Sequence, residues 1–167
     1  MTDTTRELID DFLAQKRLAL VGVSHDPKDF SREMFRELTR RGYDMVPVNP
    51  NLTDLEGVLC FDCLQDVAPP VAGALVMTAP TRSEQVVRDC AEAGIKRVWL
   101  HRGVGTGAVS RGAVEFCHDH GLSVIEGYCP YMFLEDTPAF HRVHRFFFKL
   151  TGRYPAAATR GPDSGSV

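Results

Sequence analysis

The sequence predicts an α/β fold: a three-layer arrangement in which helices cover both faces of a mostly parallel sheet of about five strands. The chain has 167 residues, which is the length of one ordinary domain. Hydrophobic residues make up 44% and charged residues 25%, as in soluble globular proteins. Short apolar runs alternate with amphipathic stretches of helical period, and the connections between them are short. This alternation is typical of parallel strands joined by crossover helices.

The chain begins with an expected helix over residues 1–15, which carries an apolar stripe. A continuous apolar run over 17–23 predicts a central strand that is buried on both faces. Residues 31–41 form the next expected helix, with Asp29 or Ser31 as its N-cap.

The second expected strand covers residues 43–48. It contains Pro47, which has no N–H to donate, so one side of this strand is weakly paired or lies near the edge of the sheet. Residues 52–70 show no regular period apart from a short expected strand at 58–61.

The second half of the chain continues the alternation. Its expected strands cover residues 71–78, 96–100 and 122–126. Thr81 and Glu84 have the spacing of a capping box at the start of one helix, which ends at Gly94. Another helix is expected over 109–120.

Composition excludes several classes of protein. The net charge of −3 argues against a general nucleic-acid binder, and no run of 18 apolar residues predicts a membrane span. The N-terminus lacks the apolar segment of a secretory signal, and the odd number of five Cys suggests reduced thiols, so we expect a cytoplasmic protein. Cys60 and Cys63 form a C-x-x-C without a second ligand pair, so no metal site is expected.

Ligands of open parallel sheets bind outside the carboxyl ends of the strands, where the strand order reverses. The residues that follow the expected strands here are small or polar, or are prolines, rather than acid and base pairs. They are Gly22, Ser24, Asn49, Pro50, Thr78, His101, Gly103, Cys129 and Pro130. This set suits a nucleotide-like ligand better than a catalytic centre.

The loop after the first strand is the strongest candidate for phosphate binding. Gly22 allows a tight turn, Ser24 offers a hydroxyl, and the next helix would begin with free N–H groups and a positive dipole end. Lys28 and Arg32 would add positive charge. The alternative is that Gly22 only permits the turn while both cations are solvated; we favour phosphate binding.

This loop is not a standard dinucleotide fingerprint. Of the pattern G-x-G-x-x-G only Gly22 is present, and Pro27 stands at the last position. An NAD site also requires Asp or Glu at the end of the second strand, where this chain has Asn49. Asn does not repel a neighbouring phosphate, so the pattern favours a ligand with an extra phosphate over NAD.

The segments VGVS (21–24), VPVNP (46–50) and VWL (98–100), with the pair Cys129-Pro130, resemble small stand-alone CoA-binding proteins. Those proteins are similar to the CoA-binding domain of the succinyl-CoA synthetase alpha subunit. The resemblance covers about residues 10–131 and implies a Rossmann-like domain that holds coenzyme A, with the adenosine diphosphate part near the first loop.

The strand ends and the resemblance together nominate twelve residues as contacts for coenzyme A. They are Gly22, Ser24, Lys28, Ser31, Arg32, Asn49, Pro50, Thr78, His101, Gly103, Cys129 and Pro130. The chain departs from the family pattern at residues 77–80, where an aromatic-Arg-Arg run is common, at His101, where Gln is common, and at Gly127, where an acid is common.

No catalytic residue is expected. His101 is interpreted as a polar rim residue rather than a base, and Cys129 as a small buried residue rather than a nucleophile. The expected function is therefore binding of CoA or an acyl-CoA without evident catalysis. Two alternatives remain open: an NAD(P)-binding protein or small oxidoreductase, and an interaction subunit that uses its C-terminal helix.

The C-terminal part differs in charge from the rest. Residues 139–167 carry a net charge of +4 and the preceding residues −7. Residues 1–135 form the expected CoA-binding domain. Residues 136–155 are predicted to form a basic amphipathic helix, packed on the domain or at an interface, and residues 156–167 are predicted to form a flexible tail. Phe146 and Phe148 lie outside the helix's apolar stripe, which is compatible with a homodimer or a protein partner.

Overall fold

The computed structural model describes residues 4–103, 105, 107–135 and 155. Five parallel strands form one sheet in the order β2-β1-β5-β6-β7. Their bounds are Arg17–Val21 for β1, Asp44–Val48 for β2, Gly73–Val76 for β5, Arg97–His101 for β6 and Ser123–Tyr128 for β7. The predicted fold class is confirmed, and β2 lies at one edge of the sheet, as Pro47 indicated.

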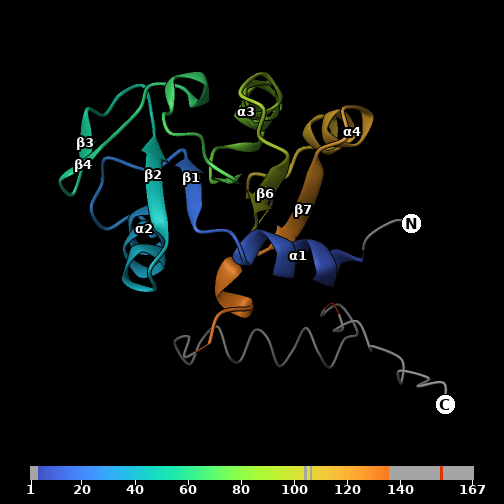
Figure 1. Ribbon diagram of the computed structural model, residues 1–167, viewed down its shortest axis with the longest axis horizontal. Helices are drawn as coiled ribbons and strands as arrows, with labels where there is room; N and C mark the ends of the chain where they lie inside the picture. The colour runs from blue at the N-terminus through green and yellow to red at the C-terminus, as the bar shows by residue number, and fades with distance from the viewer. Residues whose placement is uncertain (1–3, 104, 106, 136–154, 156–167) are drawn as a thin grey trace, which may run out of the picture.

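Helices cover both faces of this sheet (Figure 1). They are α1 (Thr5–Leu13), α2 (Phe30–Arg40), α3 (Pro80–Glu92) and α4 (Arg111–Asp119). The first two pack on one face and the last two on the other, which makes three layers. No helix in the described part of the chain has the length and apolar character needed to cross a membrane.

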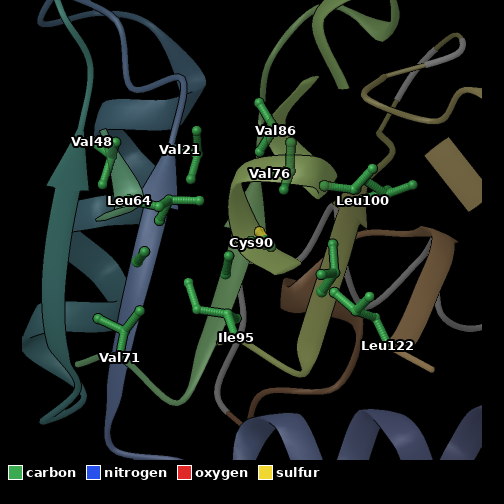
Figure 2. Close-up of a cluster of buried hydrophobic side chains, with 14 of the residues drawn as sticks. Val21, Val48, Leu64, Val71, Val76, Val86, Cys90, Ile95, Leu100 and Leu122 are labelled. Carbon is green, nitrogen blue, oxygen red and sulfur yellow. The ribbon is translucent and has the colours of Figure 1, made fainter. Parts of the chain in front are cut away.

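Each face of the sheet has its own hydrophobic core. On the α3 and α4 side, Figure 2 shows aliphatic side chains of the strands meeting Val86 and Cys90 of α3. On the other side Trp99 is completely buried and packs edge-on against Phe12 of α1, with ring centroids 5.3 Å apart. The Trp99 indole donates a hydrogen bond of 3.1 Å to the Tyr128 carbonyl, which satisfies its one polar group.

The predicted capping box of α3 is wrong. The helix begins at Pro80, one residue before Thr81, and its N-cap is Ala79, which makes no side-chain capping bond. Pro is favoured at the first helical position because its missing N–H would have no helical partner there. A capping box does occur at α1, between Thr4 and Glu7.

The segment after β2 is more ordered than the sequence suggested. Strands β3 (Asp54–Leu55) and β4 (Val58–Leu59) form an antiparallel hairpin around the turn residues Glu56 and Gly57. The expected strand at 58–61 is therefore shorter, and Phe61 makes only an isolated bridge to Val48. Two short 3-10 helices follow elsewhere, η1 at Leu64–Asp66 and η2 at Pro130–Met132.

Candidate functional site

The strand order reverses between β1 and β5. The chain passes from β1 to β2 on one side, then returns past β1 to β5 and continues through β6 to β7. At such a switch point the loops from neighbouring strands diverge to opposite faces and leave a crevice for ligands. The two loops here are residues 22–29, between β1 and α2, and residues 77–79, between β5 and α3.

Gly22 is the point at which these two loops meet. Its backbone has φ +87°, and a Cβ placed on it would lie 2.7 Å from Thr78 Cγ2 and 2.9 Å from Thr78 N. A side chain therefore has no room, because the neighbouring atoms include backbone. The glycine permits the turn, as expected, and it also brings the ends of β1 and β5 into contact.

Hydrogen bonds within the β1–α2 loop hold its shape. The N–H of Ser24 donates to Ser31 Oγ at 2.9 Å, and the Asp29 carboxylate accepts the N–H of Ser31 at 2.8 Å as well as the Ser31 hydroxyl. Asp29 is thus the N-cap of α2. The expectation of a free N–H at this helix start is wrong for Ser31, because its N–H already donates to the Asp29 carboxylate.

The Asn49 side chain makes hydrogen bonds that connect the backbone of two neighbouring segments. Its Nδ2 donates to the Val23 carbonyl at 2.7 Å, and its Oδ1 accepts the N–H of Asn51 at 2.8 Å. The side chain therefore links the end of β2 to the loop after β1 and closes the turn at exposed Pro50. It shapes the crevice whether or not it contacts a ligand.

The two cations of the loop have different environments. Lys28 is exposed. The Arg32 side chain is only 12% exposed, and its guanidinium bonds to Glu56 Oε1 at 3.0 Å and to the Ser24 and His25 carbonyls at 3.4 and 3.3 Å. Of these two cations, Lys28 is therefore the one that is exposed to solvent.

Glu56 and Arg36 belong to this region, and sequence reasoning missed both. Arg36 Nε bonds to Glu56 Oε1 at 2.7 Å, and both of its terminal nitrogens lie 3.2 Å from the Pro27 carbonyl. Both arginines hold the pKa of Glu56 below its usual value, chiefly through the Arg36 hydrogen bond. Gly57 between two short β segments is the local signal that could have revealed the hairpin turn.

The β5–α3 loop lies on the other side of the switch point. Thr78 is partly exposed, and its Oγ1 lies 3.3 Å from Ser83 Oγ, which donates to the Ala108 carbonyl at 2.6 Å. Among the described residues no side chain caps the N-terminus of α3, its first turn has no acidic residue, and Arg82 there is exposed. This helix start, unlike that of α2, suits an anion.

Of the remaining nominated residues, His101 lies deeper than expected. His101 is only 8% exposed and packs against Phe30 with ring centroids 5.5 Å apart, so its interpretation as a polar rim residue is wrong. The preceding β-bulge in the pairing with β7 accompanies this inward position. Gly103 beyond it is exposed, whereas Cys129 and Pro130 are buried.

Burial explains the behaviour of the cysteines. Desolvation raises the pKa of Cys129 to about 12 and that of Cys117 to about 11, so both are neutral thiols. Cys129 is therefore a buried apolar residue, as predicted. Cys63 is partly exposed, and its Sγ lies 3.2 Å from an Asp66 carboxylate oxygen, which raises the pKa of the thiol.

The fold and the crevice define an α/β protein of the type that binds ligands at a switch point between parallel strands. Residues 16–135 match the sequence model of the CoA binding domain family, so the chain belongs to that family. The predicted resemblance is confirmed. The matched range contains both loops of the crevice, and residues 136–155, where a basic helix was predicted, lie outside the described residues except for Pro155.

Two curated relatives support this assignment. The chain is 27% identical over 129 residues to the alpha subunit of ADP-forming acetate–CoA ligase II of Pyrococcus furiosus, which is 73% of this chain and 28% of the relative. It is 27% identical over 117 residues to the uncharacterized protein YneT of Bacillus subtilis, covering 68% and 82% of the two chains. The chain thus spans little more than a quarter of the ligase subunit.

Solved structures share the fold. A hypothetical protein from Pyrococcus horikoshii superposes with a TM-score of 0.70 at 23% identity, covering 77% of this chain and 87% of that one. The dinucleotide-forming acetyl-coenzyme A synthetase 1 of Ca. Korarchaeum cryptofilum superposes with a TM-score of 0.60 at 26% identity, covering 70% and 27%. The predicted Rossmann-like architecture is confirmed by this likeness.

Proposed function

We propose that the protein binds coenzyme A, free or acylated, in the crevice between the β1–α2 and β5–α3 loops. The observation that carries the proposal is the match of residues 16–135 to the CoA binding domain family, on a sheet whose switch point lies at Gly22 and Thr78. Ligands of such sheets bind at this edge.

The exposed groups around the crevice match the charge of coenzyme A. Lys28 and Arg82 are exposed on its two walls, and the uncapped start of α3 offers a positive dipole end to a phosphate. Ser24 and Thr78 are partly exposed and carry hydroxyls for further contacts. We assign no catalytic step to the protein, because the groups around the crevice do not include a paired acid and base among the described residues.

The test is calorimetric titration of the ligand-free protein with CoA, dephospho-CoA, NAD and NADP. We expect CoA to bind more tightly than dephospho-CoA, because the missing 3′-phosphate removes charge-assisted contacts worth about 1.5–3 kcal/mol. Preference for NAD or NADP would favour a small oxidoreductase instead. Binding of none of the four would contradict the proposal.

A pair of lysine variants locates the site. Lys28→Ala should weaken CoA about tenfold at low salt, the loss expected for one charge-assisted phosphate contact. Lys16→Ala is the matched control, because Lys16 is also exposed but precedes β1, at the amino ends of the parallel strands. Equal affinities of the two variants would remove Lys28 from the site.

Self-association through residues 136–155 is a separate proposal, which rests on the sequence pattern alone. Phe140, Val143, Phe147 and Leu150 recur at helical spacing, with Phe146 and Phe148 outside that stripe. Aromatic side chains are enriched at the cores of interfaces between subunits.

A further inference from the structure

We propose that Glu56 is a positioning residue for coenzyme A. Without touching the ligand, it holds the β1–α2 loop in its binding shape through Arg32 and Arg36. The inference rests on the proposed function and deepens it, since it names the residues outside the crevice that set the affinity. It also assigns Arg32, which the sequence nominated as a phosphate ligand, to the support of the loop.

Glu56 contacts a helix that is distant from it along the chain. Glu56 lies at the tip of the β3–β4 hairpin, 24 residues from Arg32 and 20 from Arg36 along the chain, yet its Oε1 accepts hydrogen bonds from both of these α2 arginines. The bond to Arg36 Nε is 2.7 Å and that to Arg32 Nη2 is 3.0 Å. One carboxylate therefore fixes two guanidinium groups that stand one helical turn apart.

The two guanidinium groups also contact backbone carbonyls of the β1–α2 loop. Arg32 Nη1 lies 3.4 Å from the Ser24 carbonyl and 3.3 Å from that of His25, and Arg36 lies 3.2 Å from that of Pro27. These three carbonyls belong to the β1–α2 loop. Each contact ties a guanidinium group of α2 to the backbone of this loop, so the two arginines and Glu56 together brace the loop against the helix.

The backbone of Glu56 has an unusual conformation. Its φ of +52° makes it the one described residue other than glycine with a positive φ. This conformation costs an L-residue of order 1–3 kcal/mol and persists where neighbouring contacts impose it. A glycine would satisfy the turn more easily, so the carboxylate has a use that the turn does not require, and its contacts with the two arginines supply that use.

The environment of Arg32 favours support of the loop over contact with a phosphate. The Arg32 side chain is 12% exposed and lies between a carboxylate and two carbonyls. Its two terminal nitrogens are engaged by these partners, and its Nε, which has no hydrogen-bond partner among the described residues, is buried, so a phosphate would have to displace protein groups to reach the guanidinium. Exposed Lys28 on the same loop needs no such displacement.

The test combines hydrogen exchange and titration on the full chain. Glu56→Asn removes the carboxylate and keeps a residue that tolerates positive φ, so the hairpin turn is preserved. The amides of Ser24, Asp26 and Lys28 donate hydrogen bonds inside the loop and report its order without any ligand. We expect these amides to exchange about fivefold to tenfold faster in the variant, the effect of losing one or two contacts.

Binding should change in a way that the loss of a contact with the 3′-phosphate would not produce. We expect Glu56→Asn to weaken CoA and dephospho-CoA by the same factor, about fivefold to tenfold, because the loop and not one phosphate is affected. Glu56→Gln, which keeps an acceptor oxygen at the same reach, should recover part of the affinity. Unchanged loop exchange, or tighter CoA binding in Glu56→Asn, would overturn the proposal.

Arginine variants of α2 provide the matched control. Arg36→Ala should reproduce the effect of Glu56→Asn on the loop amides, whereas Arg40→Ala should not, because Arg40 pairs with Glu37 at the other end of the helix. If the wild-type protein does not bind CoA, the proposed function fails, while loop exchange still decides the role of Glu56. If the wild type binds and Glu56→Asn binds equally well, only the positioning role fails.

Discussion

Gly22 is the residue on which the geometry of the crevice depends most directly. Its φ of +87° and its contact with Thr78 restrict the position to glycine for two independent reasons. Gly42 has nearly the same φ, +90°, but nothing lies within 4 Å of where its Cβ would be. The two glycines therefore separate backbone strain from steric conflict.

At this scale we predict that Gly22→Ala lowers the free energy of unfolding by about 2–4 kcal/mol, from backbone strain together with overpacking. Gly42→Ala, which meets only the strain, should cost about 1–2 kcal/mol. Urea unfolding followed by circular dichroism gives both values. Equal losses in the two variants would show that the contact with Thr78 has no energetic consequence.

At the scale of the element, α2 carries two arginine–glutamate groups that act on different neighbours. Near its start, Arg32 and Arg36 reach Glu56 across the hairpin. Near its end, Glu37 accepts hydrogen bonds from Arg40 and Arg41 at 2.7 Å each, and these lower the pKa of Glu37 to about 2. The first group shapes a loop, whereas the second stabilises the end of the helix locally.

The depressed pKa of Glu37 gives a pH dependence whose sign follows from linkage. The folded value of about 2 lies below the ordinary 4.5, so the stabilisation is fully present above pH 4.5 and is lost as the pH falls towards 2. Glu37→Gln should therefore lower stability by about 0.5–1 kcal/mol at pH 7, the usual value of such pairs. Urea unfolding at pH 7, 5, 4 and 3 should show this difference shrinking; a constant difference would contradict it.

At the scale of the whole molecule, two hydrophobic cores lie on opposite faces of one sheet, and their described members lie between Ile9 and Leu134. The family match also ends at residue 135. The predicted domain therefore contains the framework of the proposed site, while the basic segment after it carries the proposal of self-association.

We predict that the full chain sediments as a dimer at micromolar concentration and that a chain ending at residue 135 sediments as a monomer. The reason is the aromatic character of residues 136–155, whose side chains are typical of subunit interfaces. Sedimentation velocity of both chains, with circular dichroism as a check on folding, is the measurement. A monomeric full chain would contradict the prediction.

Local patterns were sufficient for most of the fold. The apolar runs located all five parallel strands, although the strands at 17–21 and 73–76 are shorter than their runs because only part of each run pairs in the sheet. Pro47 correctly indicated an edge strand, since a missing N–H is a local property with a direct consequence for pairing. The same patterns missed the hairpin, whose strands have two residues each.

The candidate site was predictable only in outline. Gly22 and Thr78 were correctly placed at strand ends, but no local pattern shows that these two ends meet. Nor does one show that Arg32 and Arg36 share Glu56, which lies in a different element. His101 was expected at the surface because its type is polar; its burial against Phe30 depends on how α2 packs over the end of β6.

The sequence by itself determined the family and the alternation of strands and helices, because these follow from periodicity, turn residues and short motifs. It also carries the proposal that a ligand binds at the carboxyl ends of the strands. Only the tertiary structure decided which polar groups face the crevice and which are used to build it. Ser31, Asn49 and Arg32 are of types that bind phosphates and nucleosides, yet each has partners within the protein. Hydrogen bonding in a folded chain is a competition between internal partners and ligands, and its outcome depends on distances that no stretch of sequence contains.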